Sequence, residues 1–277
     1  MPKKILWMGA LLCAAAFAGG AGQLRVMTFN VRYPAASDGP NRWEARRDIL
    51  VASVKAENPD LFGTQELFYE QGQYIVEKAP EYAWFGVSRR GDRTDEHMGV
   101  FYKPGVLRLL ESGNFWLSET PDAPGSMSWD VTLPRMVTWG LFEVKASGKK
   151  FYMYNTHFPH RSEDGAARVK CAELIQRHIS RLPKDVPFVL LGDFNTGVGS
   201  EPYRVIAAGL TDAWATAKVK SGPNGTFHGF KGTPGETRID WILFRGFAGA
   251  PEVGTVTRND GGRYPSDHFP VFATLDF

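Results

Sequence analysis

Six groups of polar residues, all drawn from Asn, Asp, Glu and His, have side chains suited to hydrolytic chemistry. They are Asn30, Glu66, His157, Asp193 with Asn195, Asp240, and Asp267 with His268. Carboxylate and amide oxygens are the ligands of hard cations such as Mg²⁺ or Mn²⁺, which keep several waters and commonly share phosphate oxygens of a substrate. Histidine transfers protons or stabilises developing negative charge. The set therefore indicates a site for a hard divalent cation.

Other hydrolytic chemistries lack their motifs in this sequence. There is no Gly-x-Ser-x-Gly, no Cys-x-x-Cys, no His-Glu-x-x-His and no glycine-rich phosphate loop ending in Lys. His157 and His160 have a spacing found among zinc ligands, but a zinc site requires a denser set of His or Cys. The chain has 2 cysteines, Cys13 and Cys171, which leaves no intramolecular disulfide once a leader containing Cys13 is removed.

The residues Asp193 and Asn195 follow an apolar run, 187–191, that predicts a buried strand ended by Gly192. In an extended segment, residues two apart point to the same face, so both side chains would be directed at one site. Phe194 would then point the other way, into apolar packing. The alternative is a turn in which Asp193 and Asn195 bond their own backbone. The polar residues at the ends of other predicted strands favour the interpretation in which Asp193 and Asn195 face a functional site.

The remaining candidates also lie at the ends of predicted strands. Alternating or apolar runs predict strands over 23–29, 60–66, 82–87, 99–102, 108–117, 136–144, 150–157, 238–244 and 271–275. Apolar residues at helical spacing predict helices from Trp43 to Asn58 and from Ser162 to Leu182. Many strands with few intervening helices predict an α+β domain of packed sheets. Functional residues commonly stand at strand ends above such a scaffold.

The N-terminus has the pattern of a secretory signal peptide. Lys3 and Lys4 precede an apolar run that ends in a small-x-small pattern before Gly19, which predicts a leader over residues 1–18 and one domain over 19–277. The expected location is periplasmic or secreted, without stable membrane insertion. The chain has 32 basic and 30 acidic residues, and the leader carries Lys3 and Lys4 but no acid. The predicted mature chain is therefore neutral, which disfavours strong non-specific binding to long nucleic acid. We expect a monomer.

The order of these motifs resembles that of the endonuclease/exonuclease/phosphatase superfamily, the metal-dependent phosphoesterases that include deoxyribonuclease I. The resemblance, to an exported bacterial-type member, spans nearly the whole mature chain, and it implies a four-layer α/β/β/α sandwich of two mainly antiparallel sheets flanked by helices. The matching segments are 28–30, 65–66, 155–157, 192–195, 238–240 and 266–270.

The resemblance also implies a metal site for Mg²⁺ or Mn²⁺. Glu66 corresponds to the principal ligand, and Asn30 and Asp267 to direct or water-mediated ligands. Arg135 matches a phosphate-contacting arginine in parts of the family. Where several nucleases of the family have an Asp two residues after the first Asn, this chain has Arg32, which leaves the number of metal ions open.

The implied catalytic roles belong to five residues. Asp193 would orient and partly deprotonate the attacking water, and Asn195 would hold a phosphate oxygen. Asp240 would bond His268 and favour its protonated form. His268 and His157 would then stabilise charge on the phosphoryl oxygens.

The expected function is that of a phosphoesterase that hydrolyses P–O bonds by direct water attack on a small phosphorylated compound or nucleotide. One alternative is a secreted nuclease acting on DNA or RNA. Another alternative is a non-catalytic binding module that retains the fold. Because Asp193 and His268 are both present, the sequence favours an enzyme over the binding module.

Overall fold

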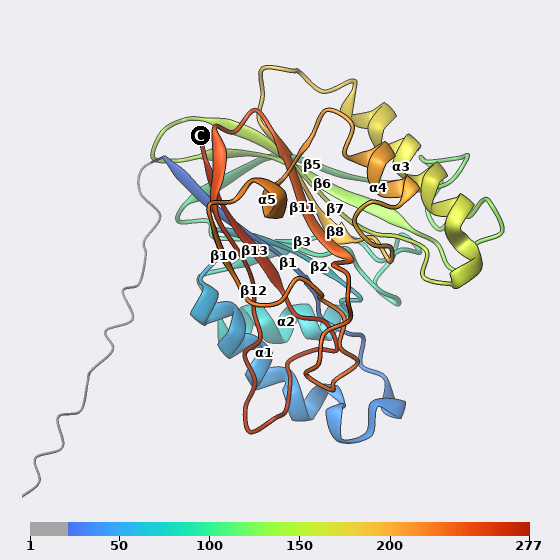
Figure 1. Cartoon of the computed structure of the whole chain (residues 1–277), viewed down its shortest axis with the longest axis vertical. Helices are drawn as coiled ribbons and strands as arrows, with labels where there is room; N and C mark the ends of the chain where they lie inside the picture. The colour runs from blue at the N-terminus through green and yellow to red at the C-terminus, as the bar shows by residue number, and fades with distance from the viewer. Residues whose placement is uncertain (1–21) are drawn as a thin grey trace, which may run out of the picture.

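The computed structural model describes residues 22–277, and the predicted signal peptide over residues 1–18 lies outside them. Thirteen strands form two sheets (Figure 1). The first sheet contains, in spatial order, β10 (Val219–Ser221), β12 (Gly249–Thr255), β13 (Val271–Asp276), β1 (Gln23–Asn30), β2 (Leu61–Gln65), β4 (Val100–Tyr102) and β3 (Ala83–Phe85). The second contains β5 (Leu107–Trp116), β6 (Met136–Val144), β7 (Lys150–His157), β8 (Phe188–Asp193), β11 (Asp240–Arg245) and β9 (Thr211–Asp212).

Helices cover the outer face of each sheet. The helices are α1 (Trp43–Glu57), α2 (Tyr69–Lys78), α3 (Gly165–Ile179), α4 (Glu201–Ile206) and α5 (Ala213–Thr216), with 3₁₀ turns at Ala36–Asn41 and Ser162–Asp164. Helices α1 and α2 lie on the first sheet, and α3 and α4 lie on the second (Figure 1). The predicted α+β four-layer sandwich is confirmed. No helix within residues 22–277 has the length and apolarity needed to cross a membrane.

The strand alternation explains how the layers are held together. In β8, Val189 and Leu191 pack between the two sheets, whereas Phe188 and Leu190 pack under α3 against residues such as Ile175. All of these side chains are fully buried. Removing apolar side chains from water is the main stabilising contribution to such layers. The run at 187–191 therefore lacks polar residues because β8 is covered on both faces.

Most strand pairs are antiparallel, as predicted, but a parallel pair lies inside each sheet. In the first sheet, β1 runs parallel to β2, with Asn30 opposite Gln65. In the second, β7 runs parallel to β8, with His157 opposite Asp193. Parallel neighbours end at the same edge. The polar residues at the ends of these four strands are consequently brought to one end of the sandwich.

The predicted elements differ from the structure mainly where the sequence is polar. Helix α1 ends before Asn58, which takes a left-handed conformation with φ of 51°, close to the predicted end. Helix α2 and strand β12 were not predicted. The buried side of α2 includes Gln71 and Gly72 as well as Ile75, so this short segment has few apolar residues to indicate a helix. Strand β12 contains Gly249, Gly254 and a proline, which obscure its alternation.

Gly192 is required by the close approach of β7 and β8. A Cβ atom added there would lie 2.5 Å from the Thr156 carbonyl oxygen. We expect Gly192→Ala to push the strands apart and to lower the free energy of unfolding by about 1–3 kcal/mol, the usual cost of overpacking. Urea denaturation measures this change.

Gly165 provides the matched control, because a Cβ there meets no atom within 4 Å and the residue begins helix α3. Gly165→Ala should leave stability unchanged or raise it, since alanine favours the helix more than glycine does. Equal destabilisation by the two variants would contradict this account of the β7–β8 contact.

Candidate active site

The amide of Asn30 joins the two sheets at the end where the polar residues meet. Its Nδ2 donates to Glu66 Oε1 at 3.0 Å and to Asp193 Oδ2 at 2.9 Å. Its Oδ1 accepts the backbone N–H of Arg32 at 3.0 Å, which fixes the orientation of the amide. The nitrogen of Asn30 therefore faces the two carboxylates. In this arrangement Asn30 positions Glu66 and Asp193, while its oxygen is engaged away from them.

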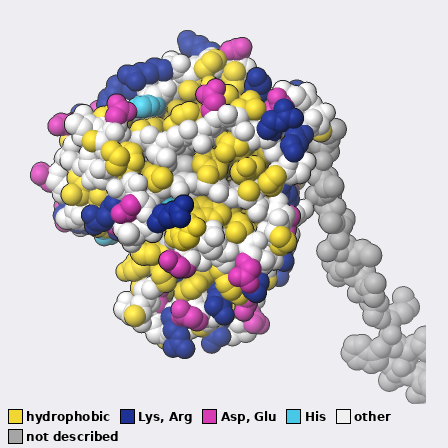
Figure 2. All heavy atoms as spheres, turned by 180° about the vertical axis from the view of Figure 1, so that it is seen from behind, with side chains coloured by type: hydrophobic (Ala, Val, Ile, Leu, Met, Phe, Trp, Pro, Cys, Tyr) yellow, Lys and Arg dark blue, Asp and Glu magenta, His cyan; other side chains and the backbone are white. Residues whose placement is uncertain are grey.

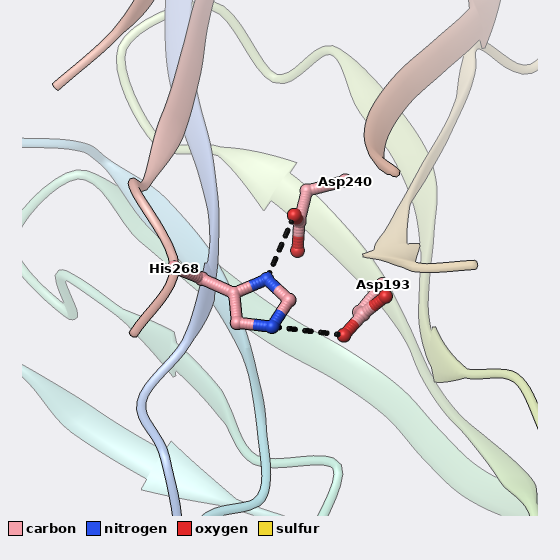
Figure 3. A group of neighbouring side chains, drawn as sticks. All are labelled: Asp193, Asp240 and His268. Atoms are coloured by element: carbon pink, nitrogen blue, oxygen red, sulfur yellow. Dashed lines mark hydrogen bonds and ion pairs between the residues drawn. The ribbon is translucent and has the colours of Figure 1, made fainter. Parts of the chain in front are cut away.

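His268 forms a buried group with the carboxylates of Asp193 and Asp240 (Figure 3). His268 Nδ1 lies 3.0 Å from Asp240 Oδ2, and His268 Nε2 lies 3.7 Å from Asp193 Oδ2. Burial disfavours the imidazolium, but the carboxylates of Asp240 and Asp193 outweigh it and raise the pKa of His268 well above its usual value. Asp240 thus holds His268 in its protonated form.

The pKa values of Asp193 and His157 are both shifted in the direction that favours the neutral form of the side chain. Burial, together with the negative charge of Asp240, raises the pKa of Asp193 above its usual range, against the opposing effect of His268. Burial and the positive charge of Arg135 lower the pKa of His157 well below its usual value. His157 Nε2 lies 3.5 Å from Asp193 Oδ2. A carboxylate with a raised pKa is a better proton acceptor near neutral pH than an ordinary Asp.

A cavity of about 590 Å³ opens over these side chains. It is lined by seven of the predicted site residues, namely Glu66, Arg135, His157, Asp193, Asn195, Asp267 and His268. Asn30 and Asp240 are buried and support the residues that line it. The structure therefore brings all nine predicted residues together at one end of the sandwich.

The loop after β8 differs from the extended segment that the sequence suggested. Asn195 has φ of 49°, its backbone N–H donates to Asp193 Oδ1 at 2.9 Å, and its Nδ2 donates to the Phe158 carbonyl at 3.1 Å. The prediction that an extended backbone places Asp193 and Asn195 on one face is wrong, because the Asx turn forms instead. Both side chains nevertheless line the cavity. Phe194 is buried and stacks on Trp241, as expected.

Glu66 and Asp267 provide the oxygen ligands that suit a hard divalent cation. Both line the cavity, and burial together with the charge of Glu66 raises the pKa of Asp267, although His268 opposes this shift. The atoms of Asp193, Asp240 and His268 also lie within 4.8 Å of one another, as metal ligands would. However, both ring nitrogens of His268 already face carboxylates, Nδ1 that of Asp240 and Nε2 that of Asp193. Glu66 and Asp267 are therefore the cavity residues that could hold such a cation.

The sequence did not indicate most of the outer cavity wall. Tyr33, Phe68 and Phe227 supply aromatic side chains, and Asp95 and Glu96 pair with Arg89 at 3.0 and 2.9 Å. The three aromatic residues lie outside the strands, in segments without a recognisable sequence pattern. Arg135 is buried, and its Nη2 lies 3.1 Å from His160 Nδ1. Arg135 therefore adds positive charge beside His157.

Comparison with known proteins identifies the family. The chain belongs to the Endonuclease/Exonuclease/phosphatase family, whose conserved region matches residues 27–268. This agrees with the resemblance seen in the sequence and with the predicted class of phosphoester hydrolase. Divalent metal ions are used by enzymes of this family, in agreement with the oxygen ligands of the cavity.

Among solved structures, a mannosyl-6-phosphatase from Bacteroides thetaiotaomicron is 35% identical, with a TM-score of 0.86 over 92% of this chain and 100% of that one. A family protein from Bacteroides vulgatus is also 35% identical, with a TM-score of 0.86 over 92% and 99%. Tyrosyl-DNA phosphodiesterase 2 from Danio rerio is 25% identical over 79% of this chain. The matches cover 60% of a mimivirus protein of unassigned function and 58% of the phosphodiesterase, so this chain aligns with little more than half of each.

Arg46 holds in place the loops next to the site residues. Its buried guanidinium donates to the carbonyls of Val31 and Pro265 at 2.6 and 2.9 Å, and to that of Arg32 at 2.6 Å. We expect Arg46→Met to remove the donors of the Val31 and Pro265 carbonyls and to lower the free energy of unfolding by at least about 2 kcal/mol, since each unsatisfied buried group costs roughly 1–3 kcal/mol. Urea denaturation measures the loss.

Arg42 is exposed and pairs only with Glu44, so Arg42→Ala is the control and should change stability by less than about 0.5 kcal/mol. A stability of Arg46→Met within error of the wild type would show that Arg46 does not hold the loops.

His228 supports the loop that carries His268. Its ring stacks on Phe269 at 3.9 Å, and burial together with the positive charge of His268 lowers the pKa of His228 to about 4. Its unfolded pKa is about 6.5. Between these values the unfolded chain binds more protons, so His228 reduces stability as the pH falls from about 6.5 to 4.

His228→Gln keeps an acceptor for the Gly232 N–H, which bonds His228 Nδ1 at 3.2 Å, but it does not titrate. Relative to the wild type, the variant should lose less stability over this pH range. Thermal melts at several pH values measure the slopes, and identical slopes would contradict a buried neutral His228.

Proposed function

We propose that this chain is a divalent-metal-dependent phosphoesterase that hydrolyses a small, sugar-like phosphate ester by direct attack of water. The observation that carries the proposal is the buried Asp193 carboxylate, which lies between His157 and the protonated His268 at the base of the cavity. Asp193 is placed to accept a proton, and His268 is placed to stabilise negative charge. A general base and a group that stabilises charge on the phosphoryl oxygens both accelerate hydrolysis of a phosphate ester.

The described residues suggest a division of roles during the reaction. Asp193 accepts a proton from the attacking water as the water oxygen bonds phosphorus, and the ester P–O bond breaks to release an alkoxide that takes up a proton from solvent. His268, held by Asp240, stabilises charge on the phosphoryl oxygens, and Asn195 faces the same space. A divalent cation held by Glu66 and Asp267 would supply Lewis-acid stabilisation of the phosphoryl group.

Several features favour a small substrate. The cavity volume of about 590 Å³ falls within the range of small-molecule sites. Tyr33, Phe68 and Phe227 provide flat apolar walls that can contact a sugar ring, and the paired charges around Arg89 can bond hydroxyl groups. On the face in Figure 2, basic and acidic side chains are interspersed. The 35% identity to a mannosyl-6-phosphatase supports a sugar phosphate in particular.

A nuclease is the second candidate, since a 25% identical relative is named as a DNA phosphodiesterase. The balanced charge of the predicted mature chain favours the small substrate, because long nucleic acid is bound chiefly through an excess of basic groups.

A phosphate-release screen tests the proposal. Sugar phosphates, inositol phosphates, nucleotides, phospholipids and DNA are each incubated with the protein and Mg²⁺ or Mn²⁺. We expect hydrolysis of hexose phosphates that stops when a chelator is added. Cleavage of DNA in preference to sugar phosphates would support the nuclease, and absence of hydrolysis with every substrate would support a binding module.

We expect Asp193→Asn to lower kcat about 10²- to 10⁴-fold, the usual contribution of general-base catalysis, while the fold is retained. Asp185→Asn is the control, because Asp185 is an exposed loop residue just before the start of β8, whereas Asp193 is at the end of this strand. Steady-state kinetics on the best substrate measures both variants, and full activity of Asp193→Asn would exclude the assigned role.

A further inference from the structure

Arg32 places a positive charge directly beside the carboxylates that we assign to the cation. Its Nη1 lies 3.8 Å from Glu66 Oε2, and its Nε lies 3.9 Å from Asp267 Oδ2. The side chain lines the cavity and is about a quarter exposed, at 23%. The guanidinium is thus a permanent cation within the acidic cluster.

The guanidinium of Arg32 is held in place by a carboxylate and an aromatic ring. Its Nε and Nη2 donate to the two oxygens of Asp38 at 3.0 and 2.8 Å, which is a bidentate pair. It also lies 4.4 Å from the centre of the Tyr33 ring. The side chain therefore has a defined position beside Glu66 and Asp267.

The backbone of Arg32 is equally constrained. Its φ is 55°, a left-handed conformation that is uncommon for residues other than glycine. The N–H donates to Asn30 Oδ1, and the carbonyl accepts from Arg46 Nη2 at 2.6 Å and from Gln71 Nε2 at 3.0 Å. These contacts fix the backbone from which the side chain extends, and the pair with Asp38 fixes the guanidinium.

Sites that hold two divalent ions place them about 3.5–4 Å apart and bridge them with shared carboxylates. The guanidinium of Arg32 lies beside both carboxylates, with nitrogen atoms 3.8 Å from a Glu66 oxygen and 3.9 Å from an Asp267 oxygen. A second ion that shared these carboxylates would come close to the fixed guanidinium and would be repelled by it. The guanidinium also neutralises part of the negative charge that a second ion would need.

We propose that Arg32 takes the place of a second cation, so that the protein binds one divalent ion at Glu66 and Asp267 rather than two. This inference rests on the metal dependence in the proposed function but not on the substrate. A protein that binds one ion and hydrolyses none of the screened substrates would overturn the proposed function and leave this inference standing.

Titration with Mn²⁺, with free ion measured by electron paramagnetic resonance, counts the ions. Glu66→Gln serves as the reference, because this variant lacks the assigned ligand. The number of ions that the variant still binds is subtracted from the number bound by the wild type. The wild type should bind one Glu66-dependent Mn²⁺ per chain, with no spectrum from a coupled ion pair. Two Glu66-dependent ions in the wild type, or none, would overturn the proposal without any variant of Arg32.

Arg32→Gln and Arg32→Lys separate charge from shape. Arg32→Gln removes the charge and should bind a second Mn²⁺ coupled to the first, whereas Arg32→Lys keeps the charge and should bind one. A single ion in a folded Arg32→Gln, or two ions in Arg32→Lys, would contradict exclusion by charge. Exposed Arg42→Gln is a further control and should bind one ion, like the wild type.

Discussion

The buried guanidinium of Arg46 is the interaction on which the arrangement of the site depends. It extends from helix α1 and bonds the carbonyls of the segment after β1 and of Pro265, next to the segment that carries Asp267 and His268. Two loops that are more than 200 residues apart in sequence are thereby fixed to one point. Burial lowers the pKa of Arg46 to about 10, so the group stays charged at neutral pH. Its charge also lies beneath the acidic cluster.

The parallel strand pairs give the second constraint. Because β1 and β2 end at the same edge, Asn30 and Glu66 become neighbours, and because β7 and β8 do the same, His157 and Asp193 meet. Asn30 then connects the two sheets by bonding Glu66 and Asp193 together. Asp193 and His157 are consequently held by regular strands, as precise positioning requires.

Much of the fold and the site could be predicted from the sequence, for reasons that are clear in the structure. Strand β8 is buried on both faces, so its continuous apolar run predicted a strand. The polar residues that follow the strands indicated the end of the sandwich where the strands converge. Helix α2 was missed because its buried face includes Gln71, which bonds a backbone carbonyl instead of packing as an apolar residue. Sequence spacing could not show the left-handed Asn195, nor which end of the Asn30 amide faces the carboxylates, because both depend on tertiary hydrogen bonds.

The aromatic walls of the cavity belong to different segments from the strand ends that carry Asp193 and His157. Tyr33, Phe68 and Phe227 lie outside the strands, where a change of side chain does not disturb the packing of the two sheets. Substrate preference can therefore change while the strands that position Asp193 and His157 keep their packing. This separation gives a structural basis for one scaffold to serve phosphatases and phosphodiesterases alike.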